Sequence, residues 1–317
     1  MYYSPNFLLE REEGELFIPQ NADFNAVVDS LKMRGYINDE VSFRFVARSM
    51  DYWKAVKPGR YLLKKKMSNM AVVKLLRSGE QTPVKVIFNN IRTLEELAPK
   101  ICRNLQMTPD SFLLKTRDTQ FIHKLGFTKE TLPSMFIPNT YNVYWNITTE
   151  ELFKRMKREY DKFWNEERKA KASALNMDFV QITTIASIVE AETKVESEKP
   201  TVAGLYINRL QQGIPLQSDP TVVFALGDFS IKRVLAKYLD IDSPYNTYKF
   251  KGLPPGPINI PAISSIDAVL NYEKHDYIYM CAKEDFSGTH NFSKTLAQHN
   301  EYARKYQKAL SKRGIYK

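Results

Sequence analysis

The sequence has few of the residues that bind metals or form disulfides. Only two cysteines, Cys102 and Cys281, occur in 317 residues, and the four histidines are scattered along the chain. Two cysteines cannot form a disulfide-rich scaffold or a cysteine-rich zinc site. The histidine spacing does not favour a metal cluster either. We therefore expect no metal and no other cofactor.

Long apolar runs are also missing. A membrane-spanning helix needs about 18 or more apolar residues, and no such run is present. The first residues lack the basic and apolar segments of a signal peptide. Composition leaves two possibilities open: a cytoplasmic protein, or a protein whose N-terminal anchor has been removed.

The chain is basic and rich enough in apolar residues to fold. Its 46 Lys and Arg residues against 36 Asp and Glu residues give a net charge of +10, and 43% of its residues are hydrophobic. Such content excludes wholesale disorder, and the length predicts two or three domains. The charge favours an anionic partner, which could be nucleic acid, a phospholipid surface or an acidic polymer.

The first hundred residues alternate between helical and strand patterns. Apolar spacing predicts helices over residues 23–34, 40–50 and 93–105, and strands near residues 60–63 and 84–88. Ser68 and Gly79 have the residue types that begin and end a further helix. The pattern predicts a small α+β unit.

Residues 148–174 have the spacing of one long amphipathic helix, capped by Thr148 or Thr149. Its Lys and Arg residues are typical of a solvated face. Its aromatic residues have core-facing spacing, which does not favour an open nucleic-acid platform.

From Asp178 onward, loops of Pro and Gly carry Asn, Gln, Tyr and His side chains. Such loops are suited to a cleft for a polar ligand, although loop residues also simply end helices.

Two carboxylates, Glu190 and Glu192, follow an almost uncharged helical stretch. Poor solvation raises the pKa of a carboxyl, and a protonated Glu beside a groove suits protonation of a glycosidic oxygen. The alternative is a helix-end salt bridge with Lys194, Lys199 or Arg209. The two residues lie about 200° apart around a helix, so at most one faces a given cleft, and spacing does not tell which.

Five motif blocks in this half resemble, in order, the signatures of the MltG (YceG-like) endolytic murein transglycosylase family. They are ASIVEAET at 186–193, VAGLYINRL at 202–210, LQSDPTV at 216–222, YNTY at 245–248 with GLPPGPI at 252–258, and GTHNF at 288–292 with LAQHN at 296–300. The first half is similar more loosely. One departure is Asn139, where the family usually has a carboxylate.

The resemblance implies an α+β protein with three parts. We expect a LysM-like subdomain with an N-terminal extension at 1–82 and a small α+β connecting region at 83–138. A mixed α/β YceG-like catalytic domain is expected at 139–317.

The resemblance also implies a reaction. The family cleaves the β-1,4 bond between N-acetylmuramic acid and N-acetylglucosamine within peptidoglycan strands. The muramic C6 hydroxyl attacks its own C1 and leaves a 1,6-anhydro end, which would end strand elongation. By match to the motif, Glu190 is expected to protonate the leaving oxygen and then to take the C6 hydroxyl proton. The alternative is a non-catalytic peptidoglycan-binding scaffold.

Six further residues are expected to contact the substrate: Gln217, Asp219, Tyr245, Asn246, Tyr248 and His290. The amides suit acetamido groups and hydroxyls, and the tyrosines suit a sugar face or, equally, a core. Asp219 could instead fix a turn, His290 could bind a loop carbonyl, and Glu192 is interpreted as structural.

The expected partners are peptidoglycan strands and peptidoglycan synthases, without nucleic acid. The resemblance places the protein in the cell membrane through a single N-terminal helix that this chain lacks. The catalytic domain would face the periplasm or the outer side.

Overall fold

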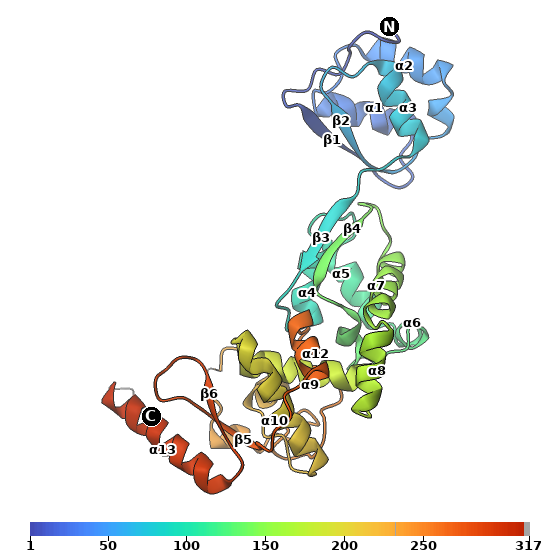
Figure 1. Ribbon diagram of the computed structural model, residues 1–317. Helices are drawn as coiled ribbons and strands as arrows, with labels where there is room; N and C mark the ends of the chain where they lie inside the picture. Colours follow the sequence, from blue (N-terminus) through green and yellow to red (C-terminus); the bar gives the residue numbers. More distant parts are fainter. Residues whose placement is uncertain (232, 314–317) are drawn as a thin grey trace. The chain divides into compact units, whose positions relative to one another are not determined.

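A computed structural model describes residues 1–231 and 233–313, which form two compact units (Figure 1). Unit 1 contains residues 1–87, 98–112 and 140–152. Unit 2 contains residues 88–97, 113–139 and the chain from residue 153 onward. The expected mixture of helices and strands is confirmed, with the strands in small two-stranded sheets.

Unit 1 begins with an antiparallel strand pair and three helices. In chain order these are β1 (Glu13–Ile18), α1 (Phe24–Met33), α2 (Glu40–Ser49), the 3-10 turn η1 (Tyr52–Lys54), β2 (Gly59–Lys64) and α3 (Asn69–Ser78). The register sets Glu13 opposite Lys64 and Ile18 opposite Gly59. The predicted caps of α3 are confirmed. Ser68 accepts a hydrogen bond from the Ala71 amide, and Gly79 ends the helix in the left-handed region at φ 74°.

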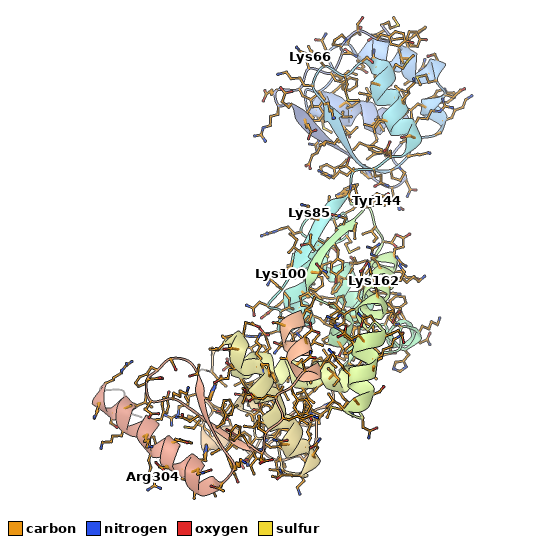
Figure 2. The ribbon with its side chains drawn as sticks, in the orientation of Figure 1. Lys66, Lys85, Lys100, Tyr144, Lys162 and Arg304 are labelled. Atoms are coloured by element: carbon orange, nitrogen blue, oxygen red, sulfur yellow. The ribbon has the colours of Figure 1, made fainter. Side chains whose placement is uncertain are left out.

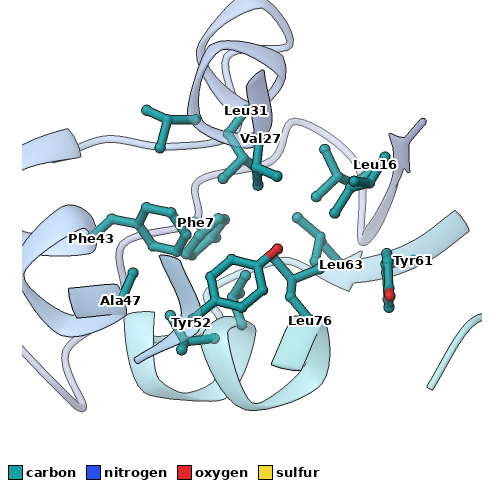
Figure 3. Close-up of a cluster of buried hydrophobic side chains, with 14 of the residues drawn as sticks. Phe7, Leu16, Val27, Leu31, Phe43, Ala47, Tyr52, Tyr61, Leu63 and Leu76 are labelled. Atoms are coloured by element: carbon teal, nitrogen blue, oxygen red, sulfur yellow. The ribbon is translucent and has the colours of Figure 1, made fainter. Parts of the chain in front are cut away.

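The core of unit 1 lies between this strand pair and the three helices (Figure 3). Phe43 of α2 is fully buried, and its ring lies 5.7 Å from that of Phe7 and 6.2 Å from that of Phe24. Alternate residues of β1, including Leu16 and Ile18, are buried, as expected for a strand with one face on a core.

Several elements connect the two halves of the sequence. They are β3 (Val84–Phe88), α4 (Leu94–Cys102), α5 (Pro109–Thr116), α6 (Thr119–Lys124), η2 (Leu132–Met135), β4 (Asn139–Val143), α7 (Thr149–Phe163) and α8 (Glu166–Ala174). Strands β3 and β4 pair in a two-stranded sheet.

The prediction of one long helix over residues 148–174 is wrong, because the chain breaks between α7 and α8. Asn165 lies at the break and accepts a hydrogen bond from the Arg168 amide (3.0 Å), which caps a new helix. Trp164, just before it, is buried and stacks on Phe179 with ring centroids 4.5 Å apart.

Thr148 is the cap of α7, with Glu151 completing a capping box.

Unit 2 is built around α9 (Phe179–Glu192), which packs against α10, α11 and α12. The remaining elements are η3 (Glu196–Glu198), α10 (Lys199–Gln211), α11 (Asp219–Leu226), η4 (Ala236–Tyr238), α12 (Ile263–Leu270), β5 (Tyr279–Ala282), β6 (His290–Ser293) and α13 (Leu296–Lys312). Strands β5 and β6 are antiparallel, with Ala282 opposite His290, and α13 packs on both.

The net positive charge is carried by side chains at the surface of each unit. Lys66 and Lys85 of unit 1 and Lys162 and Arg304 of unit 2 are exposed (Figure 2). Exposed lysines and arginines of this kind give a basic surface without entering a core.

Within the described part of the chain, no single helix combines the length and apolar composition needed to cross a membrane. Helices α8 and α9 together meet that test by length and composition, but they are bent by 82° relative to each other.

Candidate active site

The site begins with α9, a helix whose middle is buried on every side. Its N-terminus carries a capping box, in which Asp178 and Gln181 exchange side chain to backbone hydrogen bonds. Residues 182–189 are all buried. The polar side chains among them bond to backbone carbonyls one turn back, as Thr183 does with Phe179 (2.7 Å). These hydroxyls are therefore hydrogen bonded although the helix is buried.

Ser187 of α9 holds the Pro-rich loop in place. Its hydroxyl accepts a hydrogen bond from the Ile258 amide (3.0 Å), and its backbone carbonyl accepts one from the Asn259 side chain (2.7 Å). The first and fourth motif blocks are therefore joined in the interior of unit 2.

Thr247 joins the third and fourth blocks. Its carbonyl accepts a hydrogen bond from the Gln217 amide (3.0 Å), and its hydroxyl accepts one from the Ser218 amide (3.0 Å). Thr221 is also hydrogen bonded to that hydroxyl, at 2.8 Å. These bonds hold the loop before α11 against the YNTY segment.

Glu190 and Glu192 end α9 in different surroundings. Glu190 Oε2 accepts a hydrogen bond from Lys199 Nζ (3.0 Å) and another from the Ser265 hydroxyl. Lys199 is buried and also binds Glu196 Oε1 (2.6 Å). Burial by itself lowers the pKa of Lys199, but Glu196 and Glu190 outweigh that effect and raise it. Glu190 thus has the helix-end ion pair that the sequence left open.

Glu192 has neutral partners instead. Its Oε1 accepts hydrogen bonds from the Tyr206 hydroxyl (2.6 Å) and the Ser218 hydroxyl (2.6 Å). Burial raises the pKa of Glu192, and the nearby Asp219 carboxylate raises it further, against the opposite effect of the two hydroxyls. Desolvation of this kind favours a carboxyl that keeps its proton, which is what a general acid needs.

Two cavities open beside these carboxyls. The larger, of about 470 Å³, is bordered by Glu190, Asp219 and a mixture of apolar and basic side chains that includes Arg92 and Phe224. The smaller, of about 300 Å³, is mainly polar. Its polar lining residues are Glu192, Tyr206, Arg209, Gln217, Asp219, Tyr248, Tyr279, His290 and His299. Asp219 lines both cavities, so they adjoin at its side chain.

Gln217 is held in an unusual conformation at the smaller cavity. Its φ of 52° lies in the left-handed region, which non-glycine residues rarely adopt. Its Oε1 accepts a hydrogen bond from Arg209 (2.5 Å), whose guanidinium also donates to the carbonyls of Pro215 and Ile278. Because the oxygen of the amide is occupied, its NH₂ group is the part left to bind a ligand.

Asp219 and Tyr248 form a pair at the same cavity. The Tyr248 hydroxyl donates to Asp219 Oδ1 at 2.6 Å. Burial and this carboxylate raise the pKa of Tyr248. The tyrosine therefore remains a neutral donor at physiological pH.

His290 is fixed by a buried carboxylate rather than by a loop carbonyl. Both its backbone amide and its Nδ1 are hydrogen bonded to Glu198, at 2.6 and 2.8 Å. Glu198 lies on η3, 92 residues earlier in the chain.

The structure does not bring Asn246 and Tyr245 into the smaller cavity. Asn246 is fully buried, and its side chain binds the carbonyls of Leu239 and Ile241 and the Tyr248 amide. Tyr245 is half-buried, its ring lies 4.8 Å from that of Phe224, and burial raises its pKa to about 12. Their expected roles as substrate contacts stay predictions.

Sequence reasoning assigned no role to three residues that shape the site. Tyr206 and Ser218 lie inside the recognised motif blocks, and Glu198 lies between the first two. The hydroxyl or charge of these side chains was the only sign in the sequence that they could belong to the site. Their hydrogen-bond partners are distant in sequence and could not be predicted. The Ser218 hydroxyl, for example, meets Glu192 across 26 positions.

Comparison with known proteins places the chain in a family. A sequence model of the YceG-like family matches residues 16–305. The chain belongs to the YceG-like family. An endolytic murein transglycosylase of Bacillus subtilis is 30% identical over 305 residues, which are 91% of this chain and 83% of that protein. One of Streptococcus pneumoniae is 28% identical, and the match covers 84% of this chain and 53% of that protein.

The same fold occurs in a solved structure of the family. A crystal structure of a YceG-like protein from Listeria monocytogenes superposes with a TM-score of 0.61 at 28% identity. The match covers 92% of this chain and 98% of that one. The mixed α+β architecture is therefore that of the YceG-like family.

The raised pKa of Glu192 makes stability depend on pH. Above the ordinary value of 4.5, the folded state holds more protons on this carboxyl than the unfolded state does. The free energy of unfolding therefore falls as pH rises through this range. The glutamine of Glu192→Gln is neutral at every pH, so the variant does not lose stability in this way. We expect the free energy of unfolding of Glu192→Gln, relative to that of wild type, to rise by up to about 1.4 kcal/mol per pH unit from about pH 5 upward.

Urea unfolding at several values between pH 5 and 8 measures this difference. Met33→Ala, which changes an exposed residue and no titratable group, is the control and should show a flat difference. A flat difference for Glu192→Gln as well would contradict the raised pKa.

Proposed function

We propose that this protein is an endolytic lytic transglycosylase of peptidoglycan. Two relatives that match 84% or more of this chain carry the name endolytic murein transglycosylase. The observation that carries the proposal is Glu192, a carboxyl with a raised pKa at the edge of a polar cavity. Four of the six residues expected to contact the substrate line that cavity: Gln217, Asp219, Tyr248 and His290.

The proposed reaction cleaves the bond between N-acetylmuramic acid and the next N-acetylglucosamine inside a strand. A protonated carboxyl gives its proton to the leaving oxygen while the C6 hydroxyl of the muramic residue attacks C1. An intramolecular nucleophile has a high effective concentration, so a water-activating carboxylate is not required. The products are a new nonreducing end and a 1,6-anhydro end that a synthase cannot extend.

The geometry favours Glu192 over Glu190 as the acid. Glu190 is hydrogen bonded to the buried Lys199 ammonium, whereas Glu192 is bound by two hydroxyls in a desolvated setting. Glu192 Oε2 has no partner among the described residues and is free to carry the proton toward the cavity. The role expected for Glu190 stays a prediction, and we propose Glu192 in its place.

The glycan would occupy both cavities. The amide NH₂ of Gln217, the hydroxyl of Tyr248 and the ring of His290 line the smaller cavity and suit the acetamido and hydroxyl groups of the reacting sugars. The larger cavity adjoins it at Asp219 and has room for further sugars. A strand lying through both would be cut within its length, as an endolytic enzyme requires.

Two matched variants test the reaction and the acid together. With purified sacculi as substrate, we expect wild type to release fragments ending in 1,6-anhydromuramic acid, detected by mass spectrometry. Glu192→Gln should lower the rate by about 10²–10⁴-fold, the usual contribution of a general acid. Glu190→Gln should retain the activity within about tenfold, because it alters an ion pair and not the proton donor.

The opposite pattern, with Glu190→Gln inactive and Glu192→Gln active, would return the acid role to Glu190. Reducing ends from wild type would mean hydrolysis. Glycan binding without any product would favour the non-catalytic scaffold, which the intact setting of Glu192 does not support.

We further propose that the N-terminal part is a LysM-like subdomain that holds a glycan strand. Its separate core and the exposed Trp53 on η1, which is 48% accessible, support this role, because aromatic rings stack on sugar faces. In the Glu192→Gln background, Trp53→Ala should lower the fraction of protein that sediments with sacculi at least threefold. Met33→Ala, which changes an apolar residue that is more exposed than Trp53, is the control. Equal sedimentation of both would contradict the glycan role of Trp53.

Membrane anchoring and association with peptidoglycan synthases are proposals that rest on the family resemblance. The exposed basic side chains would favour an anionic membrane surface. We expect the protein to fractionate with membranes at low ionic strength, to be released by high salt, and to cross-link to synthases in cells. Recovery in the soluble fraction at low ionic strength would contradict the membrane association, and the absence of synthase cross-links would contradict the partnership.

A further inference from the structure

Glu198 and His290 form a carboxylate–imidazole pair at the smaller cavity. The Glu198 side chain is only 8% exposed, and both of its oxygens are bound to His290. Oε1 accepts the backbone amide at 2.6 Å, and Oε2 lies 2.8 Å from Nδ1. Two bonds to one residue fix the plane and the direction of the imidazole ring.

This contact determines which ring nitrogen faces the cavity. A carboxylate accepts hydrogen bonds only, so Nδ1 carries the proton in the contact with Glu198. In the neutral ring, Nε2 then has a free lone pair. Nε2 has no partner among the described residues, and His290 lines the same cavity as Glu192. The cavity therefore contains one carboxyl that can give a proton and one imidazole nitrogen that can accept one.

We propose that His290 Nε2 takes the proton of the muramic C6 hydroxyl and that Glu198 is the positioning residue for His290. This inference rests on the proposed transglycosylase function. It assigns the two proton transfers of that reaction to two different residues, whereas the family motif implied one carboxyl for both.

Glu192 gives its proton to O4 of the leaving N-acetylglucosamine as the bond from C1 to that oxygen breaks. The C6 oxygen forms the new bond to C1, and its proton passes to Nε2. The site is left with a Glu192 carboxylate and a protonated His290, and transfer of one proton from the imidazole to the carboxylate restores it. No water is consumed, and no bond other than these changes.

The position of Glu198 supports this assignment. Burial of a carboxylate is costly unless its oxygens are bound, and here both oxygens of Glu198 are bound to His290. The carboxylate holds the proton of the ring on Nδ1 and so leaves Nε2 as the nitrogen that can accept a proton. Other titratable groups line the same cavity: Glu192 of α9, Tyr206 and Arg209 of α10, Asp219 of α11, Tyr248 of the YNTY segment, Tyr279 and Cys281 of β5, and His299 of α13.

The first test separates turnover from binding. We expect His290→Asn to lower kcat for 1,6-anhydro product by about 10²–10³-fold, with KM changed by less than about threefold, because a proton acceptor acts in the chemical step. His123→Asn, which replaces an exposed histidine on α6 outside both cavities, is the matched control. Circular dichroism and thermal unfolding of each variant confirm that it is folded.

The second test uses Glu198→Gln, which keeps the size of the side chain and removes its charge. A glutamine side chain can donate as well as accept a hydrogen bond, so the contact no longer requires the proton of the ring to lie on Nδ1. We expect kcat to fall at least tenfold with KM changed by less than about threefold, and Glu198→Asp to restore part of kcat. Glu301→Gln, an exposed position on α13, should leave both constants unchanged. A role of Glu198 in folding alone would lower the amount of folded protein and leave kcat per folded molecule unchanged.

The outcomes separate this inference from the proposed function. If wild type forms no 1,6-anhydro ends, the transglycosylase proposal fails and this inference fails with it. If wild type forms them and His290→Asn retains kcat, the proton acceptor is another group and only this inference is overturned. If His290→Asn does not fold, the kcat of Glu198→Gln decides, and an unchanged kcat overturns the inference.

Discussion

Burial of α9 on every side is the constraint on which the rest of unit 2 depends. A helix packed by neighbours all round has no face on which to carry charge, so its ionisable residues can lie only at its ends. Its hydroxyls are accommodated by bonds to carbonyls one turn back, and Ser187 uses this arrangement to anchor the Pro-rich loop. The two glutamates come in the last turn, where α9 leaves the packed interior, and the cavities open at that point.

The same helix end gives its two carboxyls opposite environments. About 200° of helical rotation separates Glu190 from Glu192. Glu190 is hydrogen bonded to the buried ammonium of Lys199, the first residue of α10. Glu192 is hydrogen bonded to the hydroxyls of Tyr206 and Ser218. Different surroundings can give two glutamates different pKa values and therefore different roles. Glu190 and Lys199 hold three helices together, whereas burial raises the pKa of Glu192.

Local features of the sequence were sufficient for much of the fold and for part of the site. The caps of α3 and the division of the two glutamates follow from short-range rules, as Ser68 and the 200° spacing illustrate. The break before α8 did not, because it depends on Trp164 being buried against a later helix. The choice between the glutamates also depended on partners supplied by distant segments. The sequence pattern does not predict that Ser218 contacts Glu192. Position on the helix therefore limited the candidate acids to Glu190 and Glu192 but did not select one of them.

The conformation of Gln217 shows what the polar cavity requires of its surroundings. A non-glycine residue at φ 52° is strained, and such strain persists only where neighbouring bonds over-determine it. Here Thr247 holds the backbone, and Arg209 holds the side-chain oxygen. Arg209 is itself buried, and desolvation lowers its pKa, so its charge is maintained at a cost by carbonyl oxygens rather than by a carboxylate. The strained backbone of Gln217 and the buried charge of Arg209 both cost stability, and both fix the Gln217 amide. A need to hold its NH₂ group in one direction explains them better than a contribution to stability does.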